Sequence, residues 1–196
     1  MINHFIERLV KGKFLSEELK NSLEHHLSEI SLKKGEVLIP YGSMDTSAYL
    51  IKSGVCVCRQ ISESGNTRVV WFYFPEVFEV FGAPDSFVLN QHTKYEVEAI
   101  EDSTVIKLPG KDRIELLAEK HPEINAIILS NLMVDFVTVF EARSNLLTFT
   151  PTEYLEFLHR EYPAIFTTIP AKYIADFMGV TPEWYSKLKK AAIPAL

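Results

Sequence analysis

The chain has 196 residues, of which 47% are hydrophobic and 23% charged, and its formal net charge at pH 7 is −6. This composition is typical of one or two globular domains with a real core and excludes a disordered chain. No run of 18 apolar residues appears, and charges interrupt the apolar stretches of the N-terminus, so we expect no membrane span, no cleavable signal and no membrane partner.

The distribution of charge matters more than its sum. Residues 1–150 hold 15 Lys/Arg against 21 Asp/Glu, whereas residues 151–196 hold five of each. From Trp184 onward there is no acid, and Lys187, Lys189 and Lys190 lie together. An acidic body with a locally basic C-terminal tip is compatible with nucleic-acid binding at that tip.

The first thirty residues predict a pair of short helices. Leu15, Leu19, Leu23 and Leu27 recur four apart, as one stripe of an amphipathic helix, and Ser16 is a suitable N-cap.

From Lys34 to Leu108 the chain changes to short β-type runs separated by glycines, which predict a β-roll or jelly roll rather than a βαβ sheet. The runs are "EVLIPYG", "AYLIKSGVCVCRQI", "RVVWFYF", "YEVEAI" and "STVIKLP". Cys56 and Cys58 lie two apart in one run, where they are small hydrophobic residues. Same-face neighbours do not readily form a disulfide with each other, so we expect a reducing, cytoplasmic location.

Residues 122–149 predict one long helix that begins near Pro122. Four apolar residues alternate three and four apart, in the pattern of a coiled-coil seam: Leu129, Leu132, Phe136 and Val139. A second apolar stripe runs beside them: Ile128, Met133, Val137 and Phe140. We expect one stripe to pack on the β-roll and the other on a second copy of the chain; the alternative is a helix buried inside a monomer.

Thr150 and Pro151 give an N-cap and first-turn signal for a further helix that runs to about Tyr162, before Pro163. Residues 171–190 then predict a helix-turn-helix. Ala175 is small where two helices must approach closely, and Gly179 suits the left-handed turn residue. The apolar set of the pair is Ile174, Met178, Val180, Tyr185 and Leu188.

The second helix of this unit has an outward face that such motifs insert into the major groove of DNA. Its candidate DNA-binding residues are Thr181, Pro182, Glu183, Ser186, Lys187 and Lys190. A carboxylate can accept from cytosine N4, and lysines suit guanine or phosphate. A helical hairpin that packs another core is the alternative, but it does not require the Ala–Gly–Thr-Pro spacing.

This order of parts resembles the Crp–Fnr family of bacterial transcription regulators over nearly the whole chain. "LKKGEVLIPYGSMDTSAYLIKSGVCVC" is similar to the family's opening motif, and "IADFMGVTPEWYSKLKK" to its ending. The resemblance implies an α+β fold with a sensor β-roll over 1–121, a dimerisation helix over 122–149 and a DNA-binding helix-turn-helix over 150–196. It also implies a cytoplasmic homodimer with double-stranded DNA as partner, and RNA polymerase as a candidate partner.

The family's nucleotide cassette has the form F-G-E-L…R-S/T-A, and here it is degenerate. The matching positions are Phe81, Gly82, Ala83, Pro84, Thr93 and Lys94. Ala83 replaces the glutamate that would bind the ribose, Thr93 replaces the phosphate-binding arginine, and Asp85 adds a negative charge. Losing a paired charge contact costs on the order of 2–5 kcal/mol, which argues against cyclic AMP. The pocket is then either empty or takes a different, less charged effector.

Other sensor and enzyme chemistries have little support. A family-type iron–sulfur sensor needs four cysteine ligands, and the chain has two cysteines. No nucleophile–base spacing, Walker-type loop or metal-ligand cluster appears, so we expect neither a metal nor an enzyme.

Only "AAIPAL" follows Lys190, so we expect no C-terminal wing and, with fewer phosphate contacts, weaker DNA binding with a shallower salt dependence. The alternative function is a dimeric small-molecule sensor or protein-interaction module that does not bind DNA.

Overall fold

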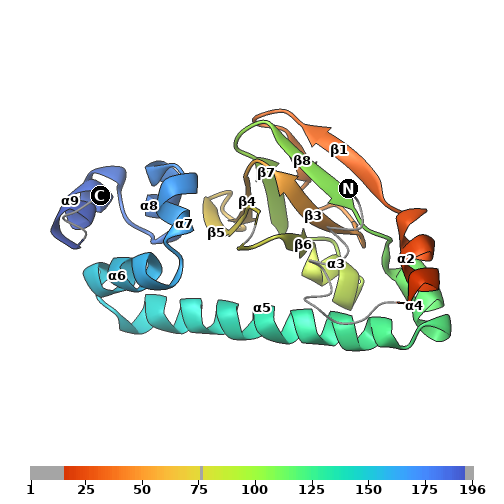
Figure 1. Cartoon of the computed structure of the whole chain (residues 1–196). Coiled ribbons are helices and arrows are strands. Elements are labelled where there is room, and N and C mark those ends of the chain that lie inside the picture. Colours follow the sequence, from red (N-terminus) through yellow and green to blue (C-terminus); the bar gives the residue numbers. More distant parts are fainter. Residues whose placement is uncertain (1–15, 76, 193–196) are drawn as a thin grey trace.

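A computed structural model gives the structure of residues 16–75 and 77–192. In this part of the chain two four-stranded antiparallel sheets form a β-roll, with strand orders β1-β8-β3-β6 and β2-β7-β4-β5 (Figure 1). The strands are β1 (Ser28–Leu32), β2 (Val37–Ile39), β3 (Ala48–Ser53), β4 (Cys56–Ile61), β5 (Thr67–Tyr73), β6 (Val80–Gly82), β7 (Tyr95–Ala99) and β8 (Ser103–Lys107).

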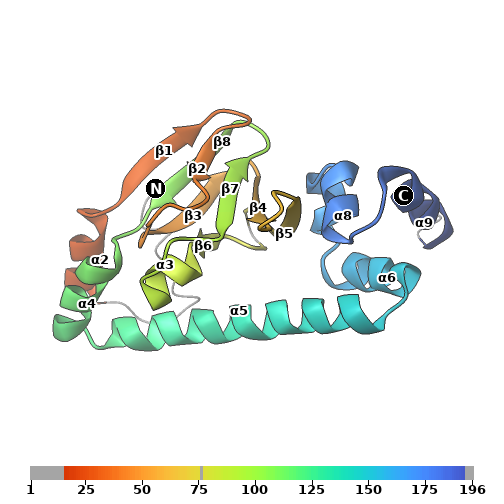
Figure 2. The ribbon, with the colours of Figure 1, turned by 180° about the vertical axis from the view of Figure 1, so that it is seen from behind.

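Helices flank this roll and continue beyond it. They are α2 (Glu17–Glu24), α3 (Pro84–Leu89), α4 (Lys111–Lys120), α5 (Glu123–Thr148), α6 (Pro151–Glu161), α7 (Ala164–Thr168), α8 (Ala171–Phe177) and α9 (Pro182–Ala192). The long α5 runs along one side of the molecule, with α2 and α4 near its start and α6 near its end (Figures 1 and 2). The structure confirms the expected α+β class, with a β-roll, a long helix and C-terminal helices.

The β4–β5 part of the sheet β2-β7-β4-β5 is buried on both faces, because alternate side chains of these two strands enter two different cores. In β4, Cys56 and Cys58 point into the core of the roll, whereas Val57 belongs to a second core shared with α6–α9. In β5, Val69 and Phe72 join that second core. The continuous apolar run of β5 is the pattern expected of a strand that is covered on both sides.

The N-terminal region differs from the prediction. Ser16 caps α2 as expected, because its Oγ accepts a hydrogen bond from Leu19 N at 3.2 Å. The helix ends at Glu24, however, and Ser28–Leu32 forms β1, which pairs with β8. Leu27 therefore lies outside the helix, although it still packs near Leu19, and Leu15 and any earlier helix lie outside the described residues. The four-residue spacing of the leucines extended the predicted helix to Leu27, next to the residue at which β1 begins.

Three helices and one short strand had no counterpart in the sequence analysis, namely α3, α4, α7 and β6. The helices α3 and α7 span only six and five residues, and β6 spans three, so their apolar patterns are too brief to define a period. The ten-residue α4 was missed although it is longer than α2.

The long helix α5 is buried only near its ends. Ile124 and Ile127 pack with Leu19 and Leu117, and Ala142 is 4% exposed near the other end. Within residues 128–141 no side chain is buried in the single chain.

The prediction that one stripe of α5 packs on the β-roll is therefore wrong. Met133, Val137 and Phe140 are 54%, 58% and 63% exposed, and only Ile128 of that stripe packs, partly, against the core formed with Leu19. The first stripe is exposed as well: Leu129, Leu132, Phe136 and Val139. The alternative of a helix buried in a monomer fails for the same reason. The α5 periodicity identified two apolar faces correctly, but the rest of the chain buries the helix only near its ends.

The beginning of α6 agrees with the prediction in detail. Thr150 Oγ1 accepts from Glu153 N at 3.3 Å, and the Glu153 carboxylate accepts from Thr150 N at 2.7 Å, which completes a capping box. These hydrogen bonds hold the pKa of Glu153 below its usual value. Pro151 occupies the first helical position, and the helix ends at Glu161, one residue before Tyr162.

Tyr154 of α6 carries a buried hydroxyl that has no hydrogen-bond partner within the described residues, and the residue is 1% exposed. Because an unsatisfied buried polar group costs about 1–3 kcal/mol, we predict that Tyr154→Phe keeps or raises the free energy of unfolding, by up to about 1 kcal/mol. Urea unfolding of the full chain, followed by circular dichroism, measures this change.

The matched control is Tyr49→Phe. Tyr49 is also buried, at 3% exposed, but its hydroxyl donates to Asp45 Oδ2 at 2.6 Å, so its loss lowers the free energy of unfolding by about 1 kcal/mol. A Tyr154→Phe variant that is destabilised as much as Tyr49→Phe contradicts the assignment of an unsatisfied hydroxyl.

Candidate nucleic-acid interface and sensor pocket

The pair α8–α9 has the backbone geometry that the sequence predicted. Gly179 adopts φ +70°, in the left-handed region that glycine tolerates best, and Val180 N donates to Ala175 O at 3.0 Å across the turn. Thr181 caps α9, because its Oγ1 accepts from Trp184 N at 3.2 Å. Local hydrogen bonds therefore hold the turn, at which the chain changes direction between α8 and α9.

Side-chain burial in this pair separates a packed face from an open one. Ala175 is 0% exposed, as expected where the helices approach each other. The other members of the predicted apolar set are buried, except Val180, which is partly buried: Ile174, Met178, Tyr185 and Leu188. The predicted DNA-binding residues are all exposed on the other face: Thr181, Pro182, Glu183, Ser186, Lys187 and Lys190.

The charges on the open face of α9 are asymmetric along the helix. Glu183 lies in the first turn, and Lys190 lies in the last turn, which complements the helix dipole. Lys189 differs from its neighbours, because its Nζ lies 5.9 Å from the centre of the Phe166 ring. Ser186 Oγ donates to Pro182 O at 2.9 Å, within the helix. Lys187 and Lys190 are the exposed cations of this face.

The residues of the degenerate cassette come together at one end of the β-roll. Phe81 and Gly82 lie in β6, Ala83 caps α3 and Pro84 begins it. The ring of Phe81 is stacked between Tyr49 and Tyr73, with ring centres 5.6 and 4.5 Å away. These three aromatic rings fill the interior of the roll beside the cassette, which the sequence analysis did not foresee.

Asp85 supplies the negative charge of the cassette, and its carboxylate is engaged by the backbone. Oδ2 accepts from Lys94 N at 2.7 Å, and Oδ1 accepts from Ser86 N at 3.1 Å. The Lys94 side chain is exposed. A carboxylate of the chain itself thus takes backbone donors that an external anion would otherwise need.

Thr93 is 1% exposed and is also satisfied internally. Its N–H donates to Ser43 O at 2.9 Å, and its Oγ1 accepts from Tyr95 N at 3.1 Å. The cassette segment 81–94 contains no arginine. The arrangement therefore offers an internal anion and buried apolar rings, and it lacks the guanidinium fork that binds a phosphate bidentately.

The two cysteines are buried and not bonded to each other. Burial is the main cause that raises the pKa of each thiol to about 12. A protonated, buried thiol is a poor nucleophile and a poor metal ligand. Within the described residues no group of three His, Cys, Asp or Glu side chains is placed to hold a metal ion.

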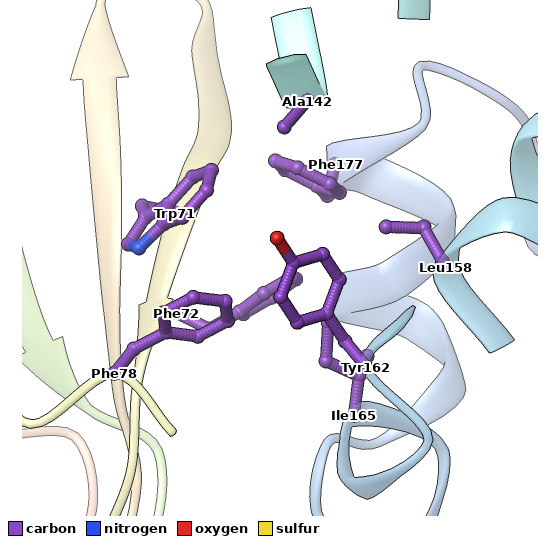
Figure 3. A pocket seen from close by; sticks show the side chains of 8 residues that line it. All are labelled: Trp71, Phe72, Phe78, Ala142, Leu158, Tyr162, Ile165 and Phe177. Carbon is purple, nitrogen blue, oxygen red and sulfur yellow. The ribbon is translucent and has the colours of Figure 1, made fainter. Parts of the chain in front are cut away.

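A narrow apolar cavity lies where the β-roll meets the C-terminal helices (Figure 3). Rings from the β-roll side face Phe177 and Leu158 across it, and Ala142 of α5 closes one end. It is lined by Trp71, Phe72, Phe78, Ala142, Leu158, Tyr162, Ile165 and Phe177. The cavity marks a packed junction between the β-roll and the helices α6, α7 and α8.

Comparison with known proteins agrees with this architecture. Residues 29–120 match the model of the cyclic nucleotide-binding domain. The chain is 26% identical over 183 residues to the anaerobic regulatory protein of Haemophilus influenzae, a match that covers 88% of this chain and 68% of that protein. In sequence and in fold the chain is thus similar to proteins of the Crp–Fnr type. A second curated relative, from Aggregatibacter actinomycetemcomitans, is also named an anaerobic regulatory protein and is 25% identical over the same length.

Solved structures show the same fold at low identity. FixK2 from Bradyrhizobium japonicum superimposes with a TM-score of 0.68 at 19% identity, over 84% of this chain and 83% of that chain. The catabolite activator protein of Thermus thermophilus superimposes with a TM-score of 0.56 at 18% identity, over 93% and 85% of the two chains. The Crp–Fnr fold thus extends from the β-roll through α5 to the C-terminal helices.

Proposed function

We propose that this chain is a cytoplasmic, homodimeric DNA-binding transcription regulator of the Crp–Fnr type, whose sensor domain does not bind cyclic AMP. Its units are the sensor over 1–121, the dimerisation helix over 122–149 and the DNA-binding unit over 150–196. The observation that carries the DNA-binding part is the division of α9, in which the apolar set packs inward and every predicted reading residue is exposed.

DNA binding follows from the chemistry of that open face. A recognition helix in the major groove can direct Glu183 to the amino group of cytosine, while Lys187 and Lys190 contact guanine or phosphate oxygens. The remainder of the chain carries the excess acid, so phosphate attraction is concentrated at the tip formed by α9. We expect binding of modest strength with a clear but shallow dependence on salt.

We predict that the full-length protein binds a random-sequence duplex pool in fluorescence anisotropy at about 50 mM salt, and more weakly at about 200 mM. The double variant Lys187→Ala/Lys190→Ala lowers the affinity, and it reduces the slope of log K against log salt by about 2, because two phosphate contacts are lost.

The control for this measurement is Lys34→Ala/Lys120→Ala, which makes the same change in net charge at exposed positions outside α8–α9. This control keeps the wild-type slope of log K against log salt if DNA contacts Lys187 and Lys190 directly. Equal losses in the two double variants indicate general electrostatics, and absence of binding at about 50 mM salt removes DNA binding from the proposal.

Dimerisation is proposed from the uncovered middle of α5. Phe136 and Phe140 stack with ring centres 5.9 Å apart, yet they are 62% and 63% exposed in the single chain. Exposed apolar surface of this extent marks an interface, and the alternation of three and four residues suits a paired helix.

A membrane does not explain the exposed face equally well. By length and hydropathy α5 could span a bilayer, with only 11% of its most apolar window buried. However, the β-roll precedes α5 and α6–α9 follow it, and these parts share one hydrophobic core. A spanning helix would place them on opposite sides of the membrane, so a second α5 is the partner that the packing allows.

We predict that Phe136→Glu weakens the dimer by about thirtyfold or more, because a charge enters the centre of an apolar interface. Sedimentation of the full chain over a range of concentrations measures the dissociation constant. Leu116→Glu on α4 is the control, since Leu116 is 52% exposed and outside the proposed interface. A wild-type monomer, or equal effects of both variants, contradicts pairing through α5.

The proposal that the sensor does not bind cyclic AMP rests on two features of the cassette. Aromatic rings pack beside it, and its polar groups hydrogen-bond to each other. Tyr49, Phe81 and Tyr73 occupy the interior, and Asp85 places a negative charge where it accepts the Lys94 N–H. A cyclic phosphate there would meet a carboxylate and no arginine, so binding would lose a charge pair and gain a repulsion. A less charged small molecule remains a suitable class of effector.

We predict that isothermal titration of the wild type with cyclic AMP shows no saturable binding up to about 1 mM. The triple variant Ala83→Glu/Asp85→Gly/Thr93→Arg restores the missing partners and removes the internal carboxylate, and it gains a dissociation constant below about 1 mM. Micromolar binding by the wild type contradicts the proposal, whatever the variant does.

A second function is favoured by one observation on α9. Trp184 is 48% exposed beside the reading face, and aromatic residues of this kind are enriched at protein interfaces. A dimeric sensor that contacts a protein through this surface becomes the leading function if the duplex titration shows no binding.

A further inference from the structure

The helix-turn-helix is joined to the β-roll by more than the chain connection through α5. One hydrophobic core contains side chains from both parts, and Figure 1 shows α8 facing the β4–β5 side of the roll. From the roll come Val55, Val57, Val69, Phe72, Phe74 and Ile100, and from the C-terminal helices Leu155, Leu158, Ile165, Ile174, Ala175 and Met178.

Phe177 at the end of α8 is the centre of the aromatic contacts across this junction. Its ring centre lies 5.1 Å from that of Phe72 and 6.1 Å from that of Trp71, in tilted and edge-on arrangements (Figure 3). Such pairs contribute beyond their buried area. They do not fix a rotation by themselves, however, because apolar packing is not directional.

Asp176 provides the directional contact. Its Oδ2 accepts a hydrogen bond from Val69 N at 2.8 Å, and its Oδ1 accepts from Arg68 Nη1 at 3.0 Å. Both donors belong to β5, the edge strand of its sheet. The carboxylate therefore pairs with a backbone N–H and a guanidinium that lie more than 100 residues earlier in the chain.

The local shape of β5 and a neighbouring cation support the same docking. The β4–β5 register shifts between Cys58 and Arg59, a bulge that sits beside Val69 on β5. Arg59, which pairs with Glu98, also lies 5.7 Å from the centre of the Tyr173 ring of α8. Covering the edge by α8 also protects β5 from pairing with another chain.

We propose that Asp176 is a positioning residue that latches the helix-turn-helix onto the edge of β5, so that sensor and reading helices form one cooperative body. The latched arrangement does not mask α9, whose predicted reading residues are all exposed. It fixes the orientation of α9 relative to the β-roll before DNA binds, so less conformational entropy is lost on binding. This consequence for DNA rests on the proposed function, whereas the latch itself does not.

The test is Asp176→Ala in the full-length protein, with two readouts. Amide hydrogen exchange at Val69, measured by NMR, becomes faster by about tenfold or more, because the N–H loses a charge-assisted acceptor and the junction opens more often. Duplex affinity at fixed salt falls by about fivefold or more. This fall runs against the charge change, since removing an acid near DNA would by itself strengthen binding.

Asp102→Ala is the matched control. Asp102 likewise accepts from one backbone N–H, Lys34 N at 3.0 Å, and from one cation, Lys33 Nζ at 2.9 Å, but both partners belong to the sensor unit. It changes the net charge equally and leaves both the Val69 exchange and the duplex affinity unchanged. Asp176→Asn keeps an acceptor at the same place, and it gives an intermediate exchange rate.

Unchanged Val69 exchange in Asp176→Ala, while β8 amides keep wild-type protection, overturns the latch. Faster exchange with unchanged duplex affinity overturns its role in positioning α9. If the wild type binds no duplex, the proposed function fails, and the exchange measurement still decides whether the latch exists.

Discussion

The arrangement of the whole molecule depends on the strand pair β4–β5, which is covered on both faces. One face closes the β-roll around Cys56, Cys58 and the aromatic stack, and the other receives the helices after α5. A sheet with two apolar faces cannot leave either of them in water without a large loss of hydrophobic stabilisation. The C-terminal unit is therefore required to cover the sensor, and the sensor in turn is required to orient that unit.

Local sequence signals predicted the C-terminal part of the fold well, and long-range contacts explain what they missed. The turn at Gly179 and the Thr150 N-cap each depend on residues within one turn of each other, so the sequence spacing alone predicts them. The contacts of Asp176 with β5 join positions more than 100 residues apart, and nothing in the surrounding pattern indicates a partner. The strand Ser28–Leu32 was not predicted, because the leucine spacing before it suggested a helix. Its partner strand β8 is also far away in the sequence.

Periodicity also has a limit that α5 makes plain. The repeat of three and four residues identified its apolar stripes, but it carried no information about what covers them. The structure shows that the chain itself buries only the ends, at Ile124, Ile127 and Ala142. In the cassette, the residues at the family positions were identified from the sequence. That the Asp85 carboxylate binds the Lys94 N–H, and that three rings fill the interior, required coordinates.

The charge distribution gives the docked arrangement a functional logic. Acidic residues predominate throughout the sensor and α5, whereas Lys187 and Lys190 lie on α9, at the end of the molecule away from the β-roll (Figures 1 and 2). Because exposed charges are screened beyond about 8 Å at physiological salt, a phosphate chain near α9 is attracted by these lysines and hardly feels the acids of the body. The rest of the chain carries a net negative charge, which on average repels a duplex. A flexible tether would let α9 turn back toward the acidic body and lose this separation. The contacts of α8 with β5 keep Lys187 and Lys190 away from the acidic body. Under the proposed function, these contacts therefore preserve the charge separation that directs DNA to α9.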